Sequence, residues 1–185
     1  MPLIRFATAR DLYEAFPTAQ GDVDAEPDDL PALQYLQSLA QVGALNKAVA
    51  FCAYLLPRRE AVWWGCRCVK ALAPQLTAEE APLFKAAEDW VAVPEDDRRI
   101  TALELAARSN PNWPSTWLAF AAGWSGGNIL LGVQATAPAP PQQTARALRG
   151  AVLTAVSRLA PAERNKGLRT CVEDGIKIAD DQGSR

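Results

Sequence analysis

Apolar residues recur every three or four positions along almost the whole chain, which is the spacing of one face of an α-helix. The segment 44–56 is typical, with Ala48, Phe51, Cys52 and Leu55 on successive turns. Alternation of apolar and polar residues, which marks a half-buried strand, is not evident, and β-branched residues are sparse. The pattern therefore predicts an all-α protein and no strands.

Proline, glycine and capping residues divide this pattern into about eight helices. Thr8 and Thr77 each stand three positions before a carboxylate, at Asp11 and Glu80, which is the spacing of a capping box. Gly43 is suited to end one helix. The other expected boundaries are a cap at Asp29, breaks at Pro57, Pro74 and Asn110, and helix starts at Pro94 and Pro114.

Short connections between successive helices favour antiparallel helical hairpins. Hairpins are predicted over residues 30–56, 58–92 and 95–124, a helical repeat-like spacing without matching residues at equivalent positions. The expected architecture is a helical bundle or a short irregular α-solenoid of helical hairpins. In the last hairpin the expected inward residues are Ile100, Leu103 and Ala107 on one helix and Trp117, Phe120, Ala121 and Trp124 on the other.

We expect a single helical domain over residues 1–185, interrupted by three non-helical segments. These are an acidic loop at 18–29, a Gly/Pro-rich uncharged connection at 125–141 and a frayed tail at 181–185. No charged residue occurs from position 109 to 145. Glycine, asparagine and proline interrupt this uncharged stretch, so we expect a buried central helix beside an apolar surface and no membrane insertion.

The composition excludes several classes of function. The 185 residues carry a net charge of −2, which gives no general attraction to nucleic acid. The chain has no histidine, so imidazole-based catalysis and histidine metal sites are excluded. We therefore expect a protein that is not an enzyme and that needs no cofactor or metal.

Charge is nevertheless unevenly placed. Seven acidic residues and no basic one lie between Asp11 and Asp29, whereas six basic residues and one acid lie between Arg146 and Arg169. These segments either steer a partner or contact each other within one fold. The sequence leaves both alternatives open.

The four cysteines, Cys52, Cys66, Cys68 and Cys171, all fall in apolar helical patterns. They form no C-x-x-C pair, and the spacing of Cys66 and Cys68 does not suit a zinc site. We expect free, buried thiols in a reducing cytoplasmic setting, although a disulfide remains open. The first sixteen residues, which contain early acids, are not expected to be a signal peptide.

Two segments are candidates for partner binding. At the start of one helix, Arg58 and Arg59 precede Trp63 and Trp64, and adjacent helical residues point about 100° apart. One tryptophan is therefore expected in the core, while the other lines a groove or meets a neighbouring helix. The spacing also permits a cation–π contact from Arg59 to Trp63. The second candidate is the aromatic, uncharged segment 117–128. The alternative is that the tryptophans fill the core and the arginines are solvated or pair with nearby acids.

The strings LLPRREAVWWGC at residues 55–66 and NPNWPSTWLAFAAGWSGGN at 110–128 resemble an uncharacterised family of small all-helical bacterial proteins found near type VI secretion genes. The resemblance covers residues 35–130, with the ends of the chain outside it. It implies a cytoplasmic adaptor or chaperone for a secreted component. It supplies no catalytic residue.

We therefore expect a non-enzymatic protein–protein interaction module, an adaptor or chaperone for a bacterial type VI secretion component. The alternative is an immunity protein that neutralises a toxic effector and uses the acids from Asp22 to Asp29. A third hypothesis is a small enzyme in which Arg58, Arg59 and Glu60 converge in one pocket. The residues expected to bind the partner are Arg58, Arg59, Trp63, Trp64, Trp117, Trp124 and Asn128.

Overall fold

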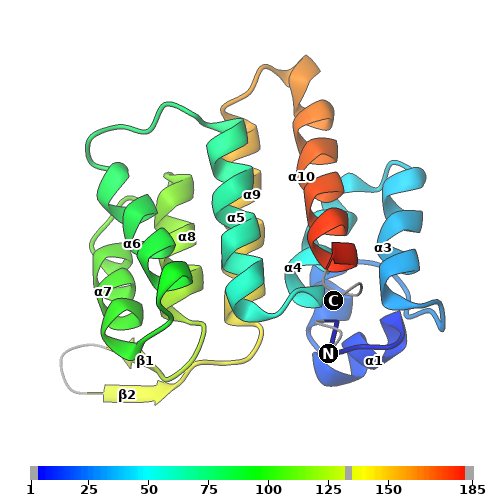
Figure 1. Cartoon of the computed structure of the whole chain (residues 1–185), viewed down its shortest axis with the longest axis horizontal. Helices are drawn as coiled ribbons and strands as arrows, with labels where there is room; N and C mark the ends of the chain where they lie inside the picture. The colour runs from blue at the N-terminus through cyan, green and yellow to red at the C-terminus, as the bar shows by residue number, and fades with distance from the viewer. Residues whose placement is uncertain (1–3, 132–134, 182–185) are drawn as a thin grey trace.

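The computed structural model describes the backbone of residues 4–131 and 135–181, and their side chains outside 128–136 (Figure 1). The regular structure in this part of the chain is almost entirely helical, which confirms the all-α prediction. It contains α1 (Ala9–Ala15), α2 (Ala19–Val23), α3 (Ala32–Gln41), α4 (Leu45–Leu55), α5 (Arg58–Leu72), α6 (Ala81–Ala92), α7 (Asp96–Ala107), α8 (Pro114–Gly123), β1 (Asn128–Leu131), β2 (Ala135–Pro138), α9 (Gln143–Ser157) and α10 (Pro161–Asp181).

Local signals place most helix ends correctly. Thr8 and Asp11 form the predicted capping box, and Gly43, at φ +76°, follows the end of α3. The cap expected at Asp29 is wrong, because its carboxylate pairs with Arg10 at 2.5 Å and the N-cap position of α3 is Pro31. The tail beyond Asp181 lies outside the described residues.

Two segments expected to be non-helical loops contain regular structure. The acidic segment 18–29 includes the short helix α2, which packs on α4 and buries Ala19 and Val23. The prediction of no strands is wrong here, because the connection 125–141 contains the antiparallel pair β1 and β2, with Asn128 opposite Pro138 and Leu131 opposite Ala135. The helix and the two strands have only four or five residues each, too few for the periodicity of side chains to reveal them.

The three predicted hairpins form, because α3 packs on α4, α5 on α6, and α7 on α8. Helices α9 and α10 do not add a further hairpin beyond α8. Instead α9 packs against α8, α5 and α4, while α10 packs against α5, α4 and α3. Figure 1 shows α5 in front of α9, with α6, α7 and α8 on one side and α10 and α3 on the other. The pair α9 and α10 thus connects the helices α3 and α4 with the helices α5 and α8.

Helix α8 lies inside this arrangement, as predicted for a central buried helix. It contacts α5, α6, α7 and α9, and Leu118, Ala119, Ala121 and Ala122 are fully buried. No helix in the described part is long and apolar enough to cross a membrane.

The predicted inward face of α7 is displaced by one position. Ile100 and Ala107 are exposed, whereas Arg99 is only 6% exposed. The Arg99 guanidinium donates to the carbonyl of Gly123 at 2.9 Å and to the Asp96 carboxylate at 2.7 Å. Because these acceptors satisfy a buried cation, α7 is able to turn its arginine inward beside Leu103.

Gly123 is a site where added volume is expected to destabilise the fold. A Cβ there would lie 2.9 Å from the Leu103 Cα and 2.6 Å from its Cβ. Replacing Gly123 by alanine is expected to lower the free energy of unfolding by about 1–3 kcal/mol, because backbone must move. Gly21→Ala in α2 is the control, since nothing from elsewhere in the fold lies within 4 Å of the place its methyl group would take. Equal thermal midpoints for the two variants would contradict this prediction.

Candidate functional site

The outer face of α5 carries a stripe of long side chains. Pro57 precedes the helix, Glu60 lies in its first turn and Lys70 in its last, which matches the helix dipole. One side of α5 is packed into the core, on α8 and α9. The other presents Arg59, Trp63, Arg67 and Lys70, spaced so that they follow one another along the helix.

The two adjacent tryptophans have opposite environments. Trp64 is fully buried, and its indole N–H donates to the carbonyl of Cys171 on α10 at 2.9 Å. Trp63 is 39% exposed. The prediction that one tryptophan is buried and the other lines a groove is therefore confirmed. Trp64 cannot contact a partner while the protein is folded.

Three adjoining hollows run along this stripe, and we call them together the α5 groove. Their volumes are about 290, 360 and 330 Å³. Trp63 borders the first two hollows, and Arg67 and Lys70 border the second and third. Helix α6 supplies Glu88, Val91 and Ala92 on one side, and α10 supplies Thr170, Cys171 and Asp174 on the other.

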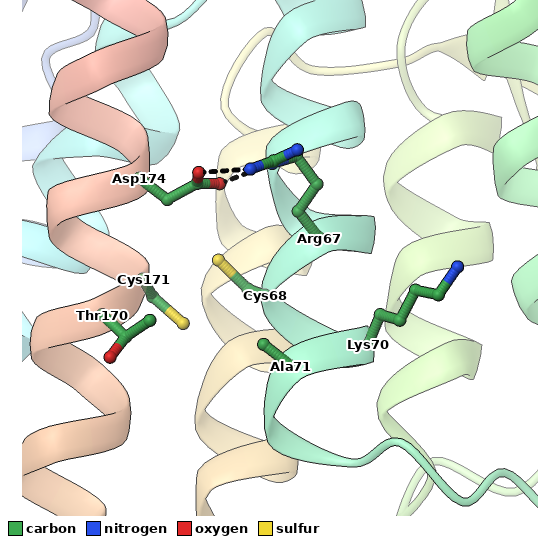
Figure 2. Close-up of a pocket in the computed structure, with 7 residues that line it drawn as sticks. All are labelled: Arg67, Cys68, Lys70, Ala71, Thr170, Cys171 and Asp174. Atoms are coloured by element: carbon green, nitrogen blue, oxygen red, sulfur yellow. Dashed lines mark hydrogen bonds and ion pairs between the residues drawn. The ribbon is translucent and has the colours of Figure 1, made fainter.

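Arg67 occupies the centre of the groove. Its guanidinium makes two hydrogen bonds to Asp174, at 2.7 and 2.6 Å (Figure 2). Its carbon Cζ lies 5.2 Å from the centroid of the Trp63 ring. The hydrogen bond to Asp174 raises the pKa of this guanidinium. The predicted cation–π partner of Trp63 was Arg59, but the contact comes from Arg67. The bidentate pair holds Arg67 against the indole.

The first two arginines of α5 point to different places. Arg58 donates to the carbonyl of Ser125 at 2.5 Å, and Arg59 donates to that of Val91 at 2.7 Å. Burial and the nearby charge of Arg5 lower the pKa of Arg58. The two guanidinium groups therefore do not form one clamp for a carboxylate or phosphate, and of the two only Arg59 borders the groove.

The second predicted segment forms a separate aromatic row. Phe120 stacks on Trp124 with ring centroids 4.4 Å apart, and Trp117 lies 5.8 Å from Phe120. All three are only half-buried, whereas the sequence pattern placed them on the inward face of α8. None of them borders the hollows of the α5 groove. The side chain of Asn128 lies outside the described residues. The structure thus leaves the predicted contact residues on two surfaces, linked by the bond from Arg58 to Ser125.

The chain matches a described family over residues 35–179. It belongs to DUF6931, a family of unknown function. The match includes α9 and most of α10, so the expected limit at residue 130 is too short. No curated protein and no solved structure matches the chain. Nothing in the DUF6931 match links the chain to type VI secretion.

The two charged segments of this DUF6931 chain contact each other. Arg146 on α9 donates to the Asp22 carboxylate at 2.7 Å, and the Tyr54 hydroxyl donates to it at 2.5 Å. Burial raises the pKa of Asp22, but these hydrogen bonds outweigh it and the net shift is downward. Asp24 pairs with Lys47 on α4 at 3.1 Å. Much of the acidic segment is therefore engaged within the fold, and no observation specifically favours the immunity hypothesis.

The three residues of the enzyme hypothesis do not converge in one pocket. Arg59 and Glu60 share one hollow, while Arg58 turns away to Ser125. Among residues 4–131 and 135–181, no group of three or more cysteine or acidic side chains is placed to hold a metal ion. The absence of enzymatic activity remains a prediction.

Sequence reasoning missed the residues that complete the groove in this DUF6931 member. Both come from α10: Asp174 lies 107 positions after Arg67, and Cys171 lies 107 positions after Trp64. Only the tertiary packing of α10 on α5 brings them to the site. Arg67 could have been found, because it stands four positions after Trp63 on the same helix.

Proposed function

We propose that this protein is a non-enzymatic protein–protein interaction module that binds its partner in the α5 groove. The supporting observation is the exposure of Trp63 at the junction of two hollows, beside an arginine already fixed by Asp174. Tryptophan and arginine dominate binding energies at protein interfaces. A side chain held in place before binding also loses less entropy on association.

The charges of the groove favour a particular kind of partner. Arg59, Arg67 and Lys70 are matched by Glu60, Glu88 and Asp174. The groove therefore has no excess of one sign to attract a highly charged ligand. A partner segment with an apolar anchor beside Trp63 and mixed polar residues around it fits this surface best.

The more specific role is an adaptor or chaperone for a type VI secretion component. Its support is the resemblance of residues 55–66 and 110–128 to the bacterial family described above. This role requires that the partner in the groove be a secretion component or an effector.

Replacing Trp63 by alanine is expected to weaken partner capture about 30-fold, the equivalent of a hot-spot loss near 2 kcal/mol. The measurement is quantitative mass spectrometry of proteins captured from the native cells by wild-type and variant protein. Val42→Ala is the matched control, because Val42 is an exposed apolar residue outside the groove and its loss should change nothing.

Two results would contradict the proposal. One is a partner that binds the Trp63→Ala variant as well as wild type. The other is a folded wild-type protein that captures no partner at near-stoichiometric yield. A captured partner unrelated to secretion would contradict only the more specific role.

A further inference from the structure

Two cysteine thiols face each other at the end of the α5 groove. Cys68 on α5 and Cys171 on α10 both border the hollow of about 330 Å³. Figure 2 shows both sulfur atoms in the space between the helices, each directed toward the opposite helix. Burial raises the pKa of the Cys68 thiol, and the neighbouring Cys171 adds to this shift. They are free cysteines, 2% and 1% exposed respectively.

Contacts close to both cysteines fix this pairing. The Arg67–Asp174 pair bridges the same two helices, and both of its members border the same hollow. The Trp64 indole donates to the backbone carbonyl of Cys171 itself. The placement of α5 against α10 at these two cysteines is thus set by hydrogen bonds that do not involve the thiols.

The number of available donors limits which ion this pair could hold. No group of three or more metal-binding side chains occurs in the part of the chain that the structure describes. Zinc takes four ligands and calcium six to eight, so neither fits two thiols. Soft thiolate ligands favour Cu(I), zinc and iron–sulfur clusters, and the last two take four protein ligands. A two-sulfur site therefore suits a soft monovalent cation.

We propose that Cys68 and Cys171 form a two-coordinate binding site for Cu(I). Each thiol loses its proton to solvent, two copper–sulfur bonds form, and no electron is transferred. The resulting unit carries one negative charge. Arg67, Lys70 and Asp174 border the same hollow and together carry one positive charge, which balances it. This site does not rest on the partner proposed for the rest of the groove.

The test is competition between the protein and the chelator bicinchoninate for Cu(I), without oxygen, on freshly reduced full-length protein. Wild type is expected to retain one equivalent of Cu(I). Cys68→Ser and Cys171→Ser are each expected to weaken binding by more than the roughly 10–100-fold that loss of a supporting residue causes. Cys66→Ser is the matched control, because Cys66 is also buried on α5 but borders the second hollow instead.

Folding is controlled by circular dichroism, with Cys68→Ala and Cys171→Ala as second variants where serine destabilises the core. X-ray absorption of the copper complex is expected to show two sulfur neighbours. The proposal is overturned if reduced wild type retains no copper against the chelator. It is also overturned if Cys66→Ser weakens binding equally, or if the spectrum shows three or more sulfur ligands.

Discussion

Replacing Trp64 by alanine is expected to lower the free energy of unfolding by about 3–5 kcal/mol. The same change at the adjacent Trp63 is expected to lower it by about 1–2 kcal/mol, mainly through lost packing and the lost contact with Arg67. The two tryptophan variants should therefore differ clearly in their free energy of unfolding. Their order should reverse in partner binding, where Trp63 is expected to matter.

The difference follows from the surroundings of each ring. Trp64 is the largest fully buried side chain, and it lies where α5 meets α10. Truncation to alanine would leave a cavity that helices on both sides cannot close without moving. It would also remove the donor to the Cys171 carbonyl, which is 2.9 Å away. Trp63 has solvent on one side and leaves no closed cavity.

The measurement is urea unfolding followed by far-UV circular dichroism, because the remaining five tryptophans complicate a fluorescence signal. If Trp64→Ala does not fold, Trp64→Phe gives the second comparison. It keeps most of the ring volume but loses the N–H donor, and is expected to cost about 1–2 kcal/mol. Equal losses for Trp63→Ala and Trp64→Ala would contradict the burial assigned to these residues.

The sequence predicts the difference between these tryptophans but not which of them is buried. Adjacent residues of an α-helix point about 100° apart, so two neighbouring tryptophans cannot face the same way. The choice depends on α10, which packs against α5 from a distant part of the chain and brings the Cys171 carbonyl to Trp64. Apolar periodicity, capping residues and proline are local, and they predicted the helices and most of their ends well. Docking between distant helices leaves no such local trace.

Contacts between helices that are distant in sequence also explain the errors in the predicted core and in the predicted site. The apolar periodicity places Ile100 inside, but the carbonyl of Gly123 on α8 accepts a buried Arg99 instead. Asp174 has no neighbour in sequence that marks it as the partner of Arg67. The charge asymmetry was visible in the sequence, yet only the packing of α2 and α9 on α4 shows that Asp22 and Arg146 pair. In each case the arginine donates to an acceptor on another helix, and the local sequence does not indicate that helix.

Removing the guanidinium of Arg158 is expected to lower the free energy of unfolding by about 3 kcal/mol, as in other broken buried ion pairs. Arg158 follows α9 and donates to both carboxylate oxygens of Glu80, at 2.7 and 3.2 Å. Glu80 is fully buried at the start of α6, where its carboxylate also accepts from the Thr77 backbone N–H. Arg158→Ala would therefore leave a buried carboxylate without its counter-charge.

A double-mutant cycle with Glu80→Gln separates this explanation from lost packing. Because glutamine carries no charge, Glu80→Gln combined with Arg158→Ala is expected to be less destabilised than the sum of the single variants. Lys85→Ala, which breaks the exposed pair with Asp89, is the control and should change stability by less than about 0.5 kcal/mol. Strictly additive losses in the cycle would mean that Arg158 stabilises the fold through its aliphatic stem and not through Glu80.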